Sequence, residues 1–147
     1  FELIWRDFFK YVSMQHRDKF FSNNGIYGTE KEWKNDINIL NSWINGKTDD
    51  PFINANMKEL SLTGFMSNRG RQNVANYLTK ELKIDWRIGA EYFESLLIDY
   101  DVHSNYGNWL YNAGIGNDSM PFRKFNPKLQ SERYDPKKIY EQTWLND

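Results

Sequence analysis

The chain has 147 residues and a mass of 17.6 kDa, a size that suits one compact domain. A formal net charge of −1 and a pI near 6.2 exclude a strongly basic nucleic-acid binder, although a local basic surface is compatible with both values. Because cysteine is absent and His16 and His103 are the two histidines, disulfides, thiol nucleophiles, thiolate metal sites and multi-histidine metal centres are excluded.

Hydrophobic periodicity predicts that the chain is built from short helices. The first covers the opening segment, where apolar residues recur at helical spacing: Leu3, Ile4, Phe8, Tyr11 and Val12. After a polar loop at 23–28, we expect a second helix to begin at a capping box of Thr29 and Glu32 and to end at Gly46. Its apolar stripe consists of Trp33, Ile37, Leu40 and Ile44.

Turn signals divide the middle of the chain. The Asp-Asp-Pro turn at 49–51 precedes a third helix, predicted over about residues 53–62 and stopped by Gly64. A fourth helix is predicted within residues 73–82, and Asp85 opens a fifth.

The last third of the chain carries two more predicted helices. A short one should follow Asn105 and end near Gly114, and an Asp-Pro pair at 135–136 should start the final one, which runs to Trp144. Residues 114–134 are otherwise predicted to be a long loop. Since no alternating pattern is long enough to build a sheet, we expect an all-α domain of six or seven short helices.

Two groups of polar residues in helical surroundings are candidates for chemistry. Glu2, Trp5 and Arg6 share one helical face, and from spacing alone a surface ion pair beside a packed tryptophan is the expected arrangement. Arg69 and Arg71 lie in a polar segment and cannot share a helical face, so we expect them to contact different partners. That segment is either a solvated helix N-terminus or an anion-binding site.

A third group, DYDVHSNYGNW at 99–109, combines carboxylates, amides and a glycine between apolar residues. Such a combination is costly to bury for structure alone. Asp99 and Asp101 could form an acid/base pair, bind a metal, or accept hydrogen bonds from a bound heterocycle. The small number of histidines disfavours a metal site. A planar ligand that accepts and donates hydrogen bonds suits the carboxylates, amides and indoles best. Six tryptophans add possible stacking surfaces, although aromatic side chains serve more often as core.

In these groups the sequence resembles the photolyase/cryptochrome family. The segment ELIWRDFF is similar to the family's helix that faces the substrate pocket, and residues 42–109, from SWINGKTDDPF to SNYGNW, resemble the diagnostic block of its flavin domain. The likeness continues through 113–144 and is poorest at 13–36. The resemblance implies that residues 1–147 are the C-terminal part of the helical FAD-binding domain, without the N-terminal α/β antenna domain. The segments SNRGRQNVA and SNYGNW resemble the DASH type.

The resemblance implies FAD as the cofactor. Five residues match positions around a folded-back FAD: Asn68, Arg71, Asp99, Asp101 and Asn105. In the family pattern Arg71 and Asp99 pair beside the flavin ring, and Asn105 faces flavin N5. The resemblance further implies a chain of tryptophans that carries electrons from the surface to the photoexcited flavin: Trp109, Trp86 and Trp43.

The resemblance also implies a DNA substrate with a flipped-out pyrimidine dimer. Trp5 would supply a stacking wall, Glu2 would accept hydrogen bonds from base N–H groups, and Arg6 would lie beside them. Gln72 and Tyr111 are similar to DASH members and make the expected pocket open and less apolar. Such a pocket offsets less of the cost of unstacking a dimer from a duplex, so the implied preference is single-stranded DNA.

The implied function is light-driven repair of cyclobutane pyrimidine dimers, a carbon–carbon lyase reaction. Two alternatives stay open: a light- or redox-signalling flavoprotein without repair, and a flavin-free helical module whose mildly basic segment 121–138 contacts DNA or protein. The family's Ser/Thr-rich phosphate-binding segment is missing from the chain. We therefore expect a partner chain or the remaining part of the protein to cover an apolar surface.

Membrane and export signals are lacking in the sequence. No apolar run approaches the roughly 20 residues that cross a bilayer. No cleavable signal is visible at the start of the chain. We therefore expect an intracellular protein with no membrane partner.

Overall fold

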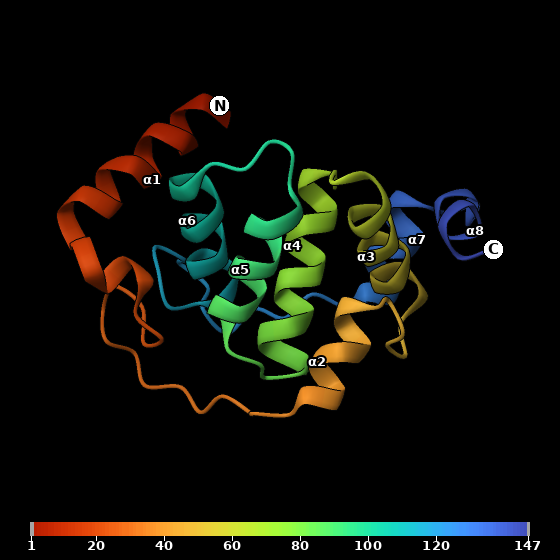
Figure 1. Cartoon of the computed structure of the whole chain (residues 1–147), viewed down its shortest axis with the longest axis horizontal. Helices are drawn as coiled ribbons and strands as arrows, with labels where there is room; N and C mark the ends of the chain where they lie inside the picture. Colours follow the sequence, from red (N-terminus) through yellow and green to blue (C-terminus); the bar gives the residue numbers. More distant parts are fainter. Residues whose placement is uncertain (1, 147) are drawn as a thin grey trace.

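The computed structural model describes residues 2–146, without the side chain of Glu2, and folds them into eight α-helices (Figure 1). The helices are α1 (Glu2–His16), α2 (Ile37–Ile44), α3 (Pro51–Thr63), α4 (Asn68–Asn76), α5 (Trp86–Leu96), α6 (Val102–Ala113), α7 (Pro127–Tyr134) and α8 (Ile139–Leu145). A 3₁₀ turn, Arg17–Phe21, continues α1, and a π-helical turn, Tyr77–Glu81, continues α4. The prediction of an all-α fold is confirmed.

Helices α4, α5 and α6 form the centre of the molecule. Helix α6 packs between α5 and α1, and α3 packs against α4 on one side and α8 on the other, so that α1 and α8 lie at opposite ends (Figure 1). The largest side chains of the core are fully or almost fully buried: Trp43, Trp86, Trp109, Phe20 and Phe93. Burial of large aromatic side chains is the main favourable term in so small a core.

Side-chain caps set where most of these helices begin. A carboxylate, amide or hydroxyl oxygen accepts a hydrogen bond from a backbone N–H of the first turn in six helices, with the caps Asp36, Asp50, Ser67, Asp85, Asp101 and Asn126. Loss of one such cap typically costs about 0.5–2 kcal/mol. Gly64 and Gly114 end α3 and α6 in the left-handed conformation, as the sequence signals predicted.

The predicted start of the second helix is wrong. Helix α2 begins at Ile37 behind the cap Asp36, not at the expected capping box of residues 29–32. The residues before it are held by a long-range contact instead. The Lys34 amide donates to the Lys83 carbonyl oxygen at 2.7 Å, and residue Lys34 forms a parallel β-bridge with Ile84. This pairing competes with helix formation and keeps the segment non-helical.

The predicted start of the sixth helix is also wrong. Helix α6 begins at Val102, because the carboxylate of Asp101 accepts the Ser104 amide at 2.8 Å and caps the first turn. Asn105 therefore lies inside the helix rather than before it.

Helix α7 occupies part of the predicted loop. Asn126 caps it and Pro127 stands in its first turn, which is an ordinary helix-start signal. Helix α8 then begins at Ile139, later than the predicted Asp-Pro pair, and Asp135 accepts hydrogen bonds from the Tyr140 and Glu141 amides.

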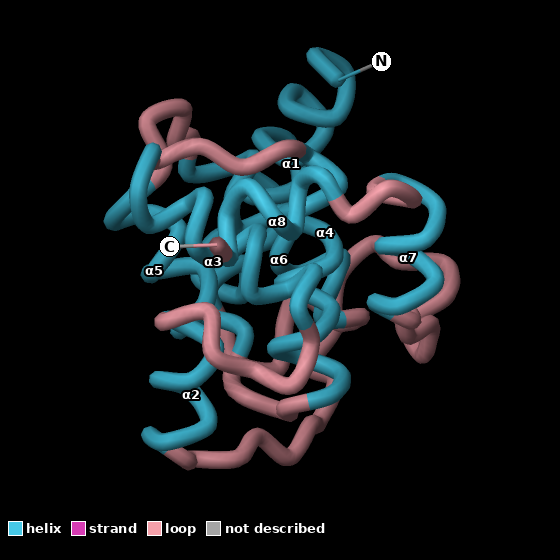
Figure 2. Tube along the Cα trace, turned by 90° about the vertical axis from the view of Figure 1, so that its right-hand side faces the viewer, coloured by secondary structure: helices cyan, strands magenta, loops and turns pink. Residues whose placement is uncertain are grey.

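Helix α1 has an exposed apolar face. Its other face packs on α6 through Phe9 and Val12, which are 3% and 7% exposed. The N-terminal end of α1 projects beyond the other helices (Figure 2). Five large side chains of α1 are exposed on the side away from the core: Leu3, Ile4, Phe8, Tyr11 and Met14. In the part that the structure describes, no helix is long and apolar enough to cross a bilayer.

Candidate functional site

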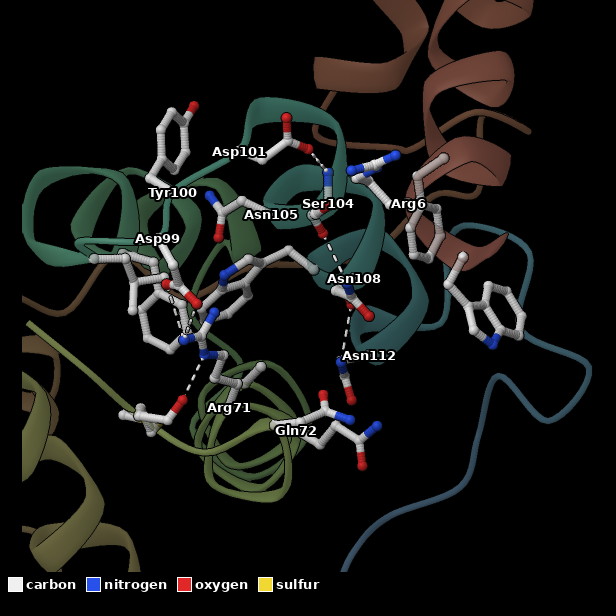
Figure 3. Close-up of a pocket in the computed structure, with 18 of the residues that line it drawn as sticks. Arg6, Arg71, Gln72, Asp99, Tyr100, Asp101, Ser104, Asn105, Asn108 and Asn112 are labelled. Atoms are coloured by element: carbon white, nitrogen blue, oxygen red, sulfur yellow. Dashed lines mark hydrogen bonds and ion pairs between the residues drawn. The ribbon is translucent and has the colours of Figure 1, made fainter. Parts of the chain in front are cut away.

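One pocket of about 560 Å³ is surrounded by α1, α4, the turn between α5 and α6, and α6 itself (Figure 3). It is lined by nine of the residues that the sequence named as candidates: Trp5, Arg6, Asn68, Arg71, Gln72, Asp99, Asp101, Asn105 and Tyr111. Trp109 of the expected electron chain lines it as well. Segments up to about a hundred residues apart in the sequence are therefore brought together at one opening.

Arg71 joins α4 to the turn that follows α5. Its Nη2 donates to both carboxylate oxygens of Asp99, at 3.0 and 2.9 Å, and its Nε donates to the Met66 carbonyl oxygen at 2.7 Å. The Asp99 carboxylate is about half exposed, so water weakens the ion pair and its main effect is on the position of both groups at the pocket wall. Arg69 instead stacks on Tyr134, 4.9 Å from the ring centre, so the two arginines have different partners as predicted.

Asp101 is a carboxylate held in its charged form. The backbone hydrogen bond from Ser104 lowers the pKa of Asp101 and outweighs the desolvation that raises it, and the Ser104 side chain and the nearby Arg6 lower it further. Neither Asp99 nor Asp101 is fully buried, because both line an open pocket. Asp101 is thus available as a charged hydrogen-bond acceptor for a ligand.

Asn105 is an oriented amide at the pocket. Its Nδ2 donates to the Ala90 carbonyl oxygen at 2.9 Å, and the residue is 8% exposed. With the amide nitrogen bonded to α5, the side-chain carbonyl oxygen is the group available to a ligand. A ligand in the pocket that points an N–H group at this oxygen would form a hydrogen bond with it.

Two further asparagines line the pocket: Asn108, which belongs to the third polar group but was given no role, and Asn112, which the sequence did not single out. Asn108 donates to the Ser104 carbonyl oxygen at 2.8 Å, and Asn112 donates to the Asn108 carbonyl oxygen at 2.9 Å (Figure 3). Both line the pocket on the same face of α6 as Asn105. A signal was present in the sequence, since polar residues at 101, 105, 108 and 112 follow helical spacing.

An aromatic corner forms the outer side of the pocket. Trp5 lies on α1 with its ring centre 6.4 Å from that of Tyr111, at an interplanar angle of 65°, and it also contacts Phe8 and Phe9. Trp5 is 43% exposed, so one part of the indole can still contact a ligand. Arg6 pairs with the neighbouring Asp7 at 3.2 Å. The Glu2 side chain, assigned to substrate binding from the sequence, lies outside the described residues.

The expected tryptophan chain does not reach the surface at Trp43. Trp43 and Trp86 are 0% exposed and Trp109 is 2% exposed. Trp43 contacts Trp109 directly, with ring centres 6.3 Å apart, and its Nε1 donates to the Val74 carbonyl oxygen. An electron chain that ends in solvent needs a more exposed outer member, and the burial of Trp43 does not suit that position.

Trp33 is a better placed candidate for the outer position. It is half-buried against the core, and its Nε1 donates to the Asn23 carbonyl oxygen at 3.3 Å. The bridge between Lys34 and Ile84 holds the backbone next to Trp33 beside the segment that leads into Trp86. Trp33 was expected in the apolar stripe of the second helix, but α2 begins at Ile37 and does not include it.

Comparisons with known proteins by sequence and by structure all point to one family. The whole chain, residues 1–147, matches the model of the FAD binding domain of DNA photolyase. A cryptochrome DASH from Danio rerio is 54% identical over 145 residues, which are 99% of this chain and 28% of that protein. The chain thus spans less than a third of this relative's length.

Two solved structures have the same fold. The crystal structure of a Synechocystis cryptochrome superposes with a TM-score of 0.96 at 54% identity, over 99% of this chain and 30% of that one. An archaeal photolyase from Sulfolobus tokodaii, solved with two FAD molecules, superposes with a TM-score of 0.92 at 38% identity, over 98% of this chain and 33% of that one.

Proposed function

Because this chain belongs to the photolyase/cryptochrome family and matches its FAD-binding domain, we propose that it forms part of a DASH-type flavoprotein that repairs pyrimidine dimers in single-stranded DNA under blue light. The observation that carries the proposal is the pocket in which flavin-type and substrate-type candidates meet. When bound, reduced FAD excited by blue light supplies the electron that splits the dimer and receives it back.

The polar wall of the pocket fits the ring system of a flavin. The Asn105 carbonyl oxygen would accept a hydrogen bond from flavin N5–H, and the ionised Asp101 would accept further hydrogen bonds from the ligand. The ion pair of Arg71 and Asp99 would lie beside the ring and contribute one donor and one acceptor. Trp109, which lines the pocket with 2% exposure, would keep water from that side.

The charges of the pocket do not suit the diphosphate of FAD, which we therefore expect to be bound elsewhere. Among the described residues, the charged groups that line the pocket are two arginines and two aspartates, so their charges cancel. Each arginine is also paired, Arg6 with Asp7 and Arg71 with Asp99. A diphosphate favours unpaired cations or free helix N-termini, whereas the starts of α4 and α6 at this pocket are capped by the side chains of Ser67 and Asp101. We therefore assign the phosphate contacts to the portion that relatives have in addition to this chain.

The aromatic corner supports a nucleobase substrate. Trp5 and Tyr111 present ring faces and edges next to the amides of Gln72 and Asn112, which suits a flipped-out pair of bases that needs both stacking and hydrogen bonds. Stacking of this kind contributes about 1–3 kcal/mol per base and does not depend on a second DNA strand.

Electrons would reach the flavin in the pocket from the surface through buried rings. The Trp109 ring lies against α5 at Gly89, one turn after Trp86, and Trp33 is the half-buried ring beside the segment before Trp86. We propose the order Trp109, Trp86, Trp33, with Trp43 as a packing residue next to Trp109.

The test uses the intact protein, in which this chain is joined to the remainder found in its relatives. FAD is added, and the visible absorption spectrum is recorded before and after blue light. Dimer-containing single-stranded oligothymidine is then illuminated with the protein, and dimer loss is measured. We expect a flavin spectrum that bleaches, and dimer loss that is weakened by Trp5→Ala. Flavin bleaching without dimer loss would replace repair by light- or redox-signalling, and a colourless protein would overturn flavin binding.

A further inference from the structure

Tyr106 connects the Trp86 indole to a carboxylate. The Tyr106 and Trp86 ring centres are 5.9 Å apart with an interplanar angle of 83°, and the phenol hydroxyl donates to Glu94 Oε2 at 3.1 Å. Tyr106 is 9% exposed and Trp86 is 0% exposed, whereas Glu94 is exposed to solvent. An oxidisable phenol therefore lies between a buried indole and a base that is in contact with water.

The surroundings keep the phenol protonated. Burial raises the pKa of Tyr106, and the hydrogen bond to Glu94 raises it further. A neutral phenol that loses an electron becomes a strong acid, so its oxidation is favourable only where a base takes the proton at once. The Glu94 carboxylate is that base, since it already accepts the hydrogen bond and can pass the proton on to solvent.

We propose that Tyr106 and Glu94 form a proton-coupled electron donor to oxidised Trp86. One electron passes from the Tyr106 phenol to the Trp86 indole radical cation, and the phenol proton passes to the Glu94 carboxylate. Trp86 returns to the neutral indole, Tyr106 becomes a neutral phenoxyl radical, and Glu94 becomes a neutral acid. The oxidant of Trp86 is a photoexcited oxidised flavin in the pocket, so this inference rests on the proposed function.

The position of Tyr106 suits this role. Tyr106 and Trp109 lie three residues apart on α6 and both face α5, so the phenol is close to the inner rings of the electron path. Glu94 also contributes to the raised pKa of Tyr100, a residue that lines the pocket. A phenoxyl radical that has lost its proton regains an electron only slowly, so the donor would lengthen the separation of charge.

Tyr92 is a matched control in the same molecule. Its ring makes a comparable edge contact with a buried tryptophan, Trp43, at 5.7 Å and 63°. Its hydroxyl, however, faces the Ile44 carbonyl oxygen at 3.5 Å, a group that cannot take up a proton. Tyr92→Phe therefore removes a phenol hydroxyl from a similar tyrosine–tryptophan pair in which no carboxylate can accept the proton.

The test needs no flavin. In the intact protein, with any cysteine of the remainder replaced by serine, Ile88→Cys gives a single attachment site at an exposed position two residues after Trp86, since residues 1–147 have no cysteine. A ruthenium(II) polypyridyl complex is attached there and oxidised by a light flash with an external electron acceptor. Transient absorption and electron paramagnetic resonance then follow the indole and phenoxyl radicals, in the parent and in Tyr106→Phe, Glu94→Gln and Tyr92→Phe.

We expect the parent to convert the indole radical into a phenoxyl radical. Tyr106→Phe should lose the phenoxyl signal and retain the indole radical, Glu94→Gln should slow the conversion, and Tyr92→Phe should match the parent. Glu94 is exposed, so its variant tests the proposal even if Tyr106→Phe folds poorly. A parent without a phenoxyl signal, or an unchanged signal in Tyr106→Phe and Glu94→Gln, would overturn the proposal. Because the oxidant is attached, failure of flavin binding cannot produce either result.

Discussion

The Trp109 indole lies directly against the α-carbon of Gly89. A Cβ built at Gly89 would be 2.2 Å from Cη2 and 2.6 Å from Cζ3 of that ring, and 2.7 Å from a methyl of Leu78. The absence of a side chain at this position lets α5 and α6 approach closely enough for Trp109 to line the pocket while it remains buried. The geometry of the pocket therefore depends on a residue that does not line it.

Gly89→Ala should lower the free energy of unfolding by about 1 kcal/mol or more, because forced repacking in a dense core typically costs about 1–3 kcal/mol. Alanine would stabilise an unobstructed helix by about 1 kcal/mol relative to glycine, so a net loss would report the contact with Trp109. Urea unfolding followed by tryptophan fluorescence measures the change. Glu91→Ala, an exposed substitution on the same helix, is the control and should stay within about 0.5 kcal/mol. Equal effects of both substitutions would contradict the prediction.

Asp99→Asn should weaken FAD binding by about tenfold while it changes stability by less than about 1 kcal/mol. The stability effect is small because the Asp99 side chain is 52% exposed. The binding effect is larger because Arg71 then faces the ligand without its charged partner. Fluorescence titration with FAD in the intact protein measures the affinity. Glu81→Gln, which breaks the exposed pair with Lys124 away from the pocket, should leave it unchanged.

Trp33→Phe should slow the light-driven reduction of bound flavin more than Trp43→Phe does. The reason is exposure: Trp33 is half-buried, whereas Trp43 is 0% exposed and cannot exchange an electron with a reductant in solution. The rate of flavin bleaching under blue light with an added reductant measures the effect in the intact protein. Trp43→Phe should instead lower the midpoint of thermal unfolding, because it removes buried ring atoms. The opposite ranking of the two bleaching rates would return the outer position to Trp43.

Local signals predicted most of the helices. The caps at 50 and 85 and the glycines at 64 and 114 act within one helical turn, and their effect can be seen in the sequence itself. The convergence of the three polar groups on one pocket could not be derived from spacing, since it depends on how α1, α4 and α6 pack. The family resemblance provided that information.

Long-range contacts account for the main errors. The backbone bridge between Lys34 and Ile84 joins positions 50 residues apart and overrides a capping-box pattern that is favourable locally. Because of the same contact, Trp33 lies outside the helix in which it was predicted, and it was not considered as the outer member of the electron chain. Asn112 was missed and Asn108 was given no role for a local reason, because the start of α6 was placed after Asn105 instead of at Val102.

Lys80 links the π-helical turn to the loop that follows α6. The residue is 8% exposed, and its Nζ donates to the carbonyl oxygen of Pro121. The neighbouring Lys31 donates in the same region to the carbonyl oxygen of Ala113. Burial, followed by repulsion from Lys31, lowers the pKa of Lys80 to about 8.

The stability of the chain should therefore rise with pH between about 8 and about 10 through Lys80. Over this range the unfolded state, in which lysine has its ordinary pKa, binds more protons than the folded state, so deprotonation favours folding. The increase should be on the order of 2 kcal/mol at most. Above about pH 10 the raised pKa values of Tyr106 and Tyr140 act in the opposite direction, because the folded state then binds more protons. Urea unfolding at several pH values measures the slope.

Lys80→Met is the variant that isolates this effect. Methionine keeps a long apolar side chain in the same space and removes the titrating group, so the rise between pH 8 and 10 should disappear while the fall above pH 10 remains. Lys83→Met, at an exposed lysine two residues after the same turn, should keep the rise of the parent. If Lys80→Met unfolds with the pH dependence of the parent, then another group is responsible for the slope. In that case the Lys80 ammonium is more strongly solvated than its contact with Pro121 implies.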